Sequence, residues 1–330
     1  RLVARIDDGD ELTYNLTEPR NHSYVVNGLL VSNCSEYVHL DDSACNLASI
    51  NLLKFLGDTD DDSDAIGGFD IDGFRHAIEV VFTAQEILVG NADYPTVTIG
   101  ETTRAFRQLG LGYANLGALL MALGLPYDSD DGRAVAAAIT SVMTGHAYRT
   151  SARLADRMGP FDGFEHNRQP MLGVLEMHRD AAELLDAEVA PALVAAGRTA
   201  WFEACALAQR VGVRNSQATV LAPTGTIGLL MDCDTTGIEP DFALVKFKKL
   251  AGGGYFKIIN HMVPKALSKL GYSPAQIEDI ALYAVGHGTL KESPALGHEA
   301  LKAKKFTEEA IAKVEKSLPE AFDIRFVFNK

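Results

Sequence analysis

Residues 214–228 read RNSQATVLAPTGTIG, and they carry the clearest structural signal of the chain. The run Gln217–Ala222 is short and rich in β-forming residues, and a proline and a glycine follow it. This pattern is typical of a buried strand that enters a tight turn. Gly225 lets the backbone approach an anion, and the amides after Pro223 and the two threonine hydroxyls can donate to it. We therefore predict a strand that leads into an anion-binding turn.

This turn is predicted to bind phosphate oxygens through five consecutive residues, which are Pro223, Thr224, Gly225, Thr226 and Ile227. It is not a Walker loop, because no Gly-Lys-Ser or Gly-Lys-Thr sequence follows. An N-capped helix start is the alternative interpretation of the Pro-Thr-Gly-Thr sequence taken alone.

Beyond residue 34 the chain alternates long helical patterns with short apolar runs. Helical periodicity predicts helices over Ile71–Leu88, Gly100–Leu123, Arg133–Met158, Arg179–Gln209 and Phe256–Leu270. Further strands are predicted at Phe242–Leu250 and Phe322–Phe328, and Asp58–Asp64 reads as a solvated acidic loop. Helices that outweigh the strands and alternate with them indicate an α/β fold with a buried sheet.

The composition is that of a globular protein, 47% hydrophobic and 22% charged over 330 residues, with a formal net charge of -14. An acidic balance argues against a sequence-independent nucleic-acid binder, which needs a basic face. Four unevenly spaced cysteines do not suggest a disulfide scaffold, and the nine histidines show no metal-ligand spacing. No apolar run reaches the length of a membrane span. We expect a cytoplasmic protein with reduced thiols, without a metal site, a membrane or a nucleic-acid partner.

Residues 1–33 are rich in β-forming and turn residues, unlike the long helical patterns of the rest of the chain. Short strands are predicted at Leu2–Ile6, Leu12–Leu16, His22–Val26 and Leu29–Ser32, with turns at Asp8–Asp10 and Asn27–Gly28. This is too little material to bury a core alone, so the segment needs upstream sequence or another chain as a partner. It ends in residues 27–36, which read NGLLVSNCSE. An asparagine can attack its own backbone carbonyl and cleave the chain after itself, and Asn33 is followed directly by the thiol of Cys34.

Residues 14–33 resemble the last two conserved sequence blocks of inteins, which are self-excising splicing elements. The resemblance implies that His22 transfers protons, that Asn33 cyclises and that Cys34 accepts the upstream segment. Two positions depart from the common pattern: Ser32 stands where many inteins have histidine, and Asn15 where the family often has aspartate. The alternative is a β-hairpin linker in which Asn27–Gly28 is only a turn.

Residues 34–330 resemble the second half of a ribonucleotide reductase. The matching segments are Cys34-Ser35-Glu36, the run Cys45–Asn51 eleven residues after the first cysteine, residues 214–228, and Thr235–Pro240. The runs Ser43–Ser49 and Lys246–Gly254 resemble the class II, adenosylcobalamin-dependent enzymes more than class I. The resemblance implies a ten-stranded α/β barrel, of which residues 34–330 supply the truncated C-terminal half, preceded by a small all-β intein piece over residues 1–33.

The same resemblance assigns roles to three residues of the predicted active site. Cys34 would carry a thiyl radical, Glu36 would be the base at the substrate 3′-hydroxyl, and Cys45 would be one of two reducing thiols. An i, i+2 relation in an extended segment places Cys34 and Glu36 on one side. The resemblance implies that the second thiol belongs to the upstream half of the reductase. Two buried thiols and a surface carboxylate are the alternative interpretation of these residues alone.

The family further implies adenosylcobalamin as cofactor, a ribonucleotide substrate and a deoxynucleotide or ATP effector. The partners it implies are a thioredoxin-type reductant, the upstream half of the reductase and the N-terminal intein part. Reduction of ribonucleotides to 2′-deoxyribonucleotides would then begin only after intein excision. Two other functions remain open: the C-terminal half of a split intein, with protein splicing as its own activity, and an inactive nucleotide-binding domain.

Other motifs receive no role in this chemistry. Gly110-Leu111-Gly112 lacks the rest of a dinucleotide fingerprint, because Asn115 stands where the third glycine would be, so we interpret it as a helix start. Gly252–Gly254 is predicted to be a connector. Cys205 lies in an apolar helical stripe and is expected in the core, and Cys233 has no assigned role. His39 and His166 are interpreted as satisfied polar groups.

Overall fold

The computed structural model describes residues 23–26, 29–32, 39–44, 46–57, 66, 68–249, 255–318, 321 and 324–328. The chain divides into two compact units, Arg1–Val38 and His39–Lys330. In the first unit β1 (Ser23–Val26) pairs antiparallel with β2 (Leu29–Ser32), with Val26 opposite Leu29. These two strands confirm two of the four predicted ones. The predicted strands Leu2–Ile6 and Leu12–Leu16, both turns, and the whole acidic loop Asp58–Asp64 lie outside the described residues.

The second unit is built around a parallel sheet. Strand β3 (Leu47–Asn51) pairs in parallel with β4 (Gly110–Ala114), with Leu47 opposite Gly110 and Asn51 opposite Ala114. On the other side of β4, Leu111 bridges in parallel to Thr219. Because β4 has neighbours on both sides and is buried along its whole length, it takes the central position that apolar strands of parallel sheets occupy.

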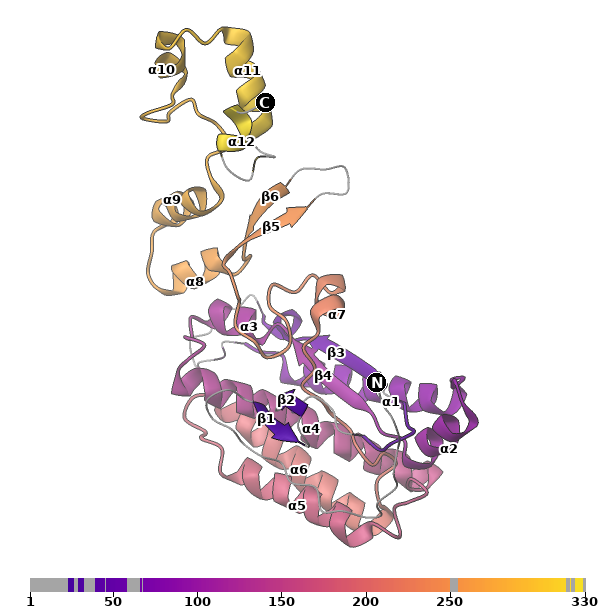
Figure 1. The fold of residues 1–330 in the computed structure, drawn as a ribbon. Coiled ribbons are helices and arrows are strands. Elements are labelled where there is room, and N and C mark those ends of the chain that lie inside the picture. The colour runs from indigo at the N-terminus through magenta and orange to yellow at the C-terminus, as the bar shows by residue number, and fades with distance from the viewer. Residues whose placement is uncertain are drawn as a thin grey trace. The chain divides into compact units, whose positions relative to one another are not determined.

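Helices α1 and α3–α6 pack with this sheet in one core, and the remaining helices lie elsewhere in the chain. Figure 1 shows α4, α5 and α6 side by side, with α1 packed on α4. The helices are α1 (Ile71–Asn91), α2 (Val97–Phe106), α3 (Leu116–Leu123), α4 (Asp130–Met158), α5 (Arg168–Glu183), α6 (Pro191–Val211), α7 (Gly225–Leu230), α8 (Val263–Lys269), α9 (Pro274–Val285), α10 (His298–Ala303), α11 (Glu308–Ser317) and α12 (Arg325–Phe328), with a 3-10 turn at Leu52–Phe55. Strands β5 (Val245–Lys249) and β6 (Tyr255–Ile259) form an antiparallel pair.

Two hydrophobic cores lie within the second unit. The larger core joins the sheet to α1 and α3–α6, and its largest fully buried side chains include Phe74, Phe82, Phe164 and Trp201. Burial of each such side chain stabilises the fold by roughly 1.5–3 kcal/mol. The smaller core is formed by Leu290, Leu301, Ile311, Val314 and Val327 near the C-terminus. None of the helices that the structure describes combines the length and apolar character that a membrane crossing needs.

The predicted helix Gly100–Leu123 is wrong, because the structure has α2, β4 and α3 in its place. Helix α2 ends at Phe106, its C-cap residue Arg107 has a left-handed backbone with φ 50°, and Gly110–Ala114 forms a strand rather than a helix start. The glycines explain the difference. A Cβ atom at Gly112 would lie 2.6 Å from the carbonyl oxygen of Val220, so the close approach of β4 to the segment 217–222 requires a residue without a side chain.

The other differences have local causes. Arg179–Gln209 is two helices, because Pro191 occupies the first position of α6 and starts a new helix there. Phe256–Leu270 divides into β6 and α8, and Phe322–Phe328, predicted as a strand, contains the short helix α12. Gln217–Ala222 contributes hydrogen bonds and one β-bridge to the sheet rather than a full strand. The helices at Ile71–Leu88 and Arg133–Met158 and the strand within Phe242–Leu250 are confirmed.

Candidate functional site

The carboxyl ends of three parallel segments meet at one edge of the sheet, which we call the carboxyl edge. Strand β3 ends at Asn51, β4 is followed by Asn115, and the segment paired through Thr219 continues into the turn 223–227. In open parallel sheets, ligands bind outside the carboxyl ends of the strands. The topology therefore places the predicted anion-binding turn where such a site is expected.

A buried hydrogen-bond network joins the segments at this edge. The Asn115 amide nitrogen donates to Asn51 Oδ1 at 3.1 Å, and Asn115 Oδ1 accepts from the Thr235 backbone nitrogen at 3.0 Å. Asn115 is fully buried and has φ 74°, a left-handed conformation that asparagine tolerates better than most residues. The Thr235 hydroxyl accepts from the Ala118 backbone nitrogen at 3.2 Å. The network thus fastens the chain beyond α7 to the ends of β3 and β4.

The two threonines of the turn are placed differently. Thr224 is 7% exposed and has φ 52°, and its hydroxyl oxygen accepts a hydrogen bond from the Gly237 backbone nitrogen at 2.6 Å. Gly225 and Thr226 are exposed, and a Cβ atom at Gly225 would meet nothing within 4 Å. Because α7 begins at Gly225, the amides of its first turn have no partner within the helix. The turn therefore offers free backbone donors and the Thr226 hydroxyl, while the Thr224 oxygen is already engaged.

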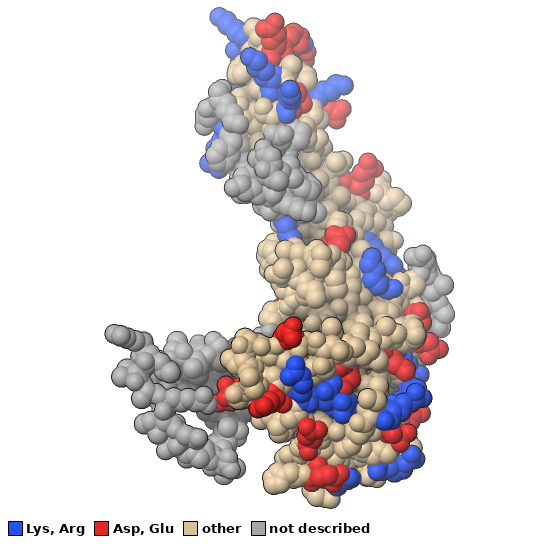
Figure 2. Space-filling model, turned by 90° about the vertical axis from the view of Figure 1, so that its right-hand side faces the viewer, with Lys and Arg blue, Asp and Glu red and all other residues tan. Residues whose placement is uncertain are grey.

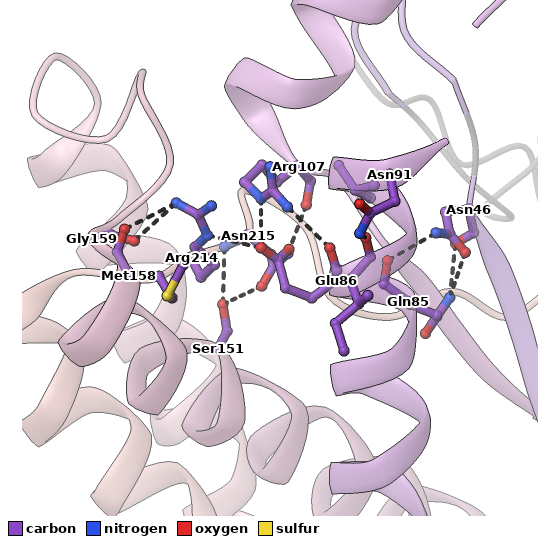
Figure 3. A network of polar contacts seen from close by, with 12 residues as sticks. Asn46, Gln85, Glu86, Asn91, Arg107, Ser151, Met158, Gly159, Arg214 and Asn215 are labelled. Carbon is purple, nitrogen blue, oxygen red and sulfur yellow. Dashed lines mark hydrogen bonds and ion pairs between the residues drawn. The ribbon is translucent and has the colours of Figure 1, made fainter. Parts of the chain in front are cut away.

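A second network lies at the opposite, amino end of the sheet, and Figure 3 shows it. Glu86 accepts hydrogen bonds from Arg107 Nε at 2.6 Å, Arg214 Nε at 2.8 Å and the Asn215 amide at 2.7 Å. Asn215 in turn accepts from the Ser151 hydroxyl at 2.8 Å. Glu86 and Arg107 are both 8% exposed. Every one of these charged groups is paired and hydrogen-bonded, as burial of charge requires.

The two described cysteines are both protonated thiols at neutral pH. Burial, followed by the nearby carboxylates of Asp234 and Asp232, raises the pKa of Cys233 to about 11. Burial also raises the pKa of Cys205, which is 4% exposed in the larger core, as predicted. Reactive cysteines have lowered pKa values, so neither thiol has the character of a nucleophile.

The structure describes only part of the predicted site. The turn Pro223–Ile227 lies at the carboxyl edge, and Asn46 lies at the start of β3, at the other end of that strand. The predicted catalytic and splicing residues His22, Asn33, Cys34, Glu36 and Cys45 lie outside the described residues. His39 contacts the Ser43 hydroxyl at 2.5 Å, and His166 is exposed.

Sequence reasoning missed Asn115, Thr235 and Glu86. Asn115 and Thr235 are 120 positions apart, and Glu86 and Asn215 are 129 apart, so no local pattern joins them. The one available signal was an asparagine directly after a glycine-rich strand, a position that favours a left-handed backbone. The described residues hold no group of three or more histidine, cysteine or acidic side chains that could bind a metal ion.

Figure 2 shows one face of the molecule, on which basic and acidic side chains are interspersed. Mixed charges of this kind are typical of a globular surface, whereas a nucleic-acid interface concentrates lysine and arginine on one face or along one stripe. The visible charge distribution therefore gives no support to a nucleic-acid-binding function.

Comparison with known proteins identifies several similar chains. The family described as ribonucleotide reductase, barrel domain, matches residues 15–314. A protein of Bradyrhizobium diazoefficiens named vitamin B12-dependent ribonucleotide reductase is 52% identical over 345 residues, which cover 99% of this chain and 27% of that protein. A protein of the same name from Streptomyces avermitilis is 54% identical over 81% of this chain and 28% of its own. The chain thus spans about a quarter of the length of these relatives.

Proposed function

The chain belongs to the ribonucleotide reductase family, as part of its barrel domain, and from this membership we propose that it supplies the substrate-phosphate half of a vitamin B12-dependent ribonucleotide reductase. One observation carries the proposal: the Pro-Thr-Gly-Thr turn lies at the carboxyl edge of the parallel sheet with open space beside Gly225. The names of these relatives support the proposal, because their sequence identity with this chain extends over most of its length.

The turn would bind the substrate through its backbone. The amides of Gly225, Thr226 and Ile227 would donate to phosphate oxygens, and the exposed Thr226 hydroxyl would add a side-chain donor. Thr224 would contribute mainly by shaping the turn, because its oxygen already accepts from Gly237. Such a site would bind the phosphates of the substrate, and contacts to the base would come from other parts of the enzyme.

The proposed reaction removes the ribose 2′-hydroxyl by radical chemistry. A thiyl radical on Cys34 would take the 3′ hydrogen, while Glu36 would accept the proton of the 3′-hydroxyl. The 2′-hydroxyl would leave as water, and Cys45 with a second thiol would give two electrons and become a disulfide. Cys34 would then return the hydrogen to C3′. These three roles are supported by the resemblance of the surrounding sequence. They are tested by measuring enzyme activity.

The proposed cofactor is adenosylcobalamin, which the names of the relatives imply. Its cobalt is held inside a corrin ring, so a cluster of protein ligands is not needed. When bound, the cofactor supplies the radical chemistry that protein side chains alone lack. A nucleotide effector, a thioredoxin-type reductant, the upstream half of the reductase and a cytoplasmic location complete the proposal.

A second candidate function is protein splicing by residues 1–33. It is favoured by the antiparallel pair β1–β2, which lies in a separate compact unit and ends directly before Asn33-Cys34. The family match beginning at residue 15 is the competing observation, because it extends across the proposed boundary. If the chain is the C-terminal half of a split intein, mixing it with an N-terminal half would give a ligated product on a gel. Absence of this product with an intact upstream half would exclude splicing in trans.

The reductase proposal is tested in the full-length polypeptide that contains this chain, with any intein already removed. Deoxyribonucleotide formation should require adenosylcobalamin and a dithiol reductant. Cys34→Ser should abolish product formation and leave nucleotide binding unchanged, whereas Cys233→Ser, a matched control, should retain turnover. Product formation by the Cys34→Ser variant would overturn the radical assignment.

A further inference from the structure

The segment 231–240, which we call the strap, crosses the carboxyl edge directly after α7. Sheet residues and their neighbours hold it at several points. The Asn51 amide and the Tyr127 hydroxyl donate to strap carbonyls at 3.3 and 2.7 Å, and Asn115 Oδ1 accepts from the Thr235 backbone nitrogen at 3.0 Å. Thr235 is 2% exposed. The strap therefore has a fixed position relative to the ends of β3 and β4.

A glycine permits the closest contact between the strap and α3. A Cβ atom at Gly117 would lie 2.9 Å from the carbonyl oxygen of Glu239 and 3.0 Å from the methyl carbon of Thr235. Any side chain at this position would push the strap away from the helix. Close packing against α3, as well as hydrogen bonds, therefore holds the strap in place.

The strap also touches the phosphate turn. The backbone nitrogen of Gly237, two residues after Thr235, donates to the Thr224 hydroxyl at 2.6 Å. Thr224 has φ 52°, a conformation that β-branched residues rarely adopt and that persists only where the surroundings impose it. The contact with Gly237 is the described hydrogen bond of the Thr224 side chain, and the strap supplies it.

We infer that Asn115 and Thr235 are positioning residues for substrate binding, which they support by holding the strap so that Gly237 keeps Thr224 in its left-handed conformation. This conformation sets the direction in which α7 begins, and therefore the direction of the amides at residues 225–227. The inference rests on the proposed function, because it assigns these amides to the substrate phosphates. Both residues are buried and bonded within the protein, so the inference gives them no direct contact with the substrate.

The test uses Thr235→Val in the full-length reductase, since valine keeps the shape of threonine and removes its hydroxyl. The KM for the ribonucleotide should rise about tenfold, because a loosened strap leaves the binding-competent turn only about one-tenth populated, while kcat stays within about twofold. Thr235→Ser restores the hydroxyl and should restore KM. Thr150→Val is the matched control, because Thr150 is also 2% exposed and its hydroxyl bonds within α4, to the carbonyl of His146.

Hydrogen–deuterium exchange of the 224–228 peptide in the same samples reports on the turn independently of turnover. Exchange should be faster in Thr235→Val than in the wild type, and unchanged in Thr150→Val. If Thr235→Val fails to fold, Tyr127→Phe tests the same strap from its 40% exposed side and should raise KM in the same direction by a smaller factor.

An unchanged KM in Thr235→Val, or a fall in kcat alone, would overturn the inference and leave the proposed function intact. Unchanged exchange in the 224–228 peptide would overturn the coupling between strap and turn. A wild-type protein that forms no deoxyribonucleotide under any condition would instead refute the proposed function, while the exchange data would still decide whether Thr235 holds the turn.

Discussion

The two ends of the parallel sheet are fastened by different chemistry. At the amino end, the Glu86 carboxylate is shared by two arginines and an asparagine, all of them partly or fully buried. At the carboxyl edge, the Asn51–Asn115–Thr235 network contains only neutral amides and hydroxyls. A charged network is costly to interrupt, because removal of one partner leaves buried charge unpaired. From this comparison we expect that the amino end stabilises the fold and that the carboxyl edge positions a binding surface.

The largest expected effect comes from Glu86→Ala at the amino end. It leaves Arg107, Arg214 and Asn215 without their shared acceptor and should lower the free energy of unfolding by about 3–5 kcal/mol. Urea denaturation measures the change. Glu101→Ala, a substitution at an exposed position of α2, is the control and should have an effect within about 0.5 kcal/mol. A similarly small loss in Glu86→Ala would show that the amino end does not secure the fold.

Acid should destabilise the fold through a buried histidine of α4, which lies against charged groups of α1 and α4. Burial lowers the pKa of His146 in α4 to about 4, and the surrounding charged groups are Arg149, Arg75, Glu79 and Arg153. Because the unfolded state binds a proton near pH 6.5 and the folded state near pH 4, the stability that the neutral ring contributes is complete above pH 6.5. It is lost as pH falls toward 4, by up to about 3 kcal/mol.

This pH dependence is measured by denaturant unfolding between pH 7 and pH 4. His146→Leu should flatten the profile relative to the wild type, whereas His166→Gln, at an exposed position, should leave it unchanged. Profiles of equal slope in the wild type and His146→Leu would assign the acid sensitivity to other groups.

Gly112→Ala tests the pairing within the sheet without changing a residue of the turn. The added methyl group would lie 2.6 Å from the Val220 carbonyl oxygen, which is backbone and cannot move aside cheaply. The substitution should destabilise the protein by about 1–3 kcal/mol, as measured by thermal unfolding. Gly173→Ala, where a Cβ atom meets nothing within 4 Å, is the control within a helix and should be neutral or slightly stabilising. Equal stability of the two variants would contradict the close strand approach.

The sequence predicted what local patterns encode. Helices α1 and α4 were evident from long apolar periodicity, and a turn at residues 223–227 from contiguous residues that follow a β-rich run, while its phosphate binding stays a prediction. Strand β4 was missed because Gly110-Leu111-Gly112 has weak strand propensity, and its conformation is imposed by neighbours on both sides. Asn115 and Thr235 could not be paired, since their contact is created by the fold and not by spacing along the chain.

The most direct test of the central claim, that the carboxyl edge binds substrate phosphate without carrying the stability of the fold, is the affinity of a Gly225→Ala variant of the full-length protein for a ribonucleotide. The methyl group meets open space in the structure, so the free energy of unfolding should change by less than about 0.5 kcal/mol. The dissociation constant, measured by calorimetry, should rise about tenfold as the methyl group crowds the bound phosphate. An unchanged dissociation constant would contradict the account.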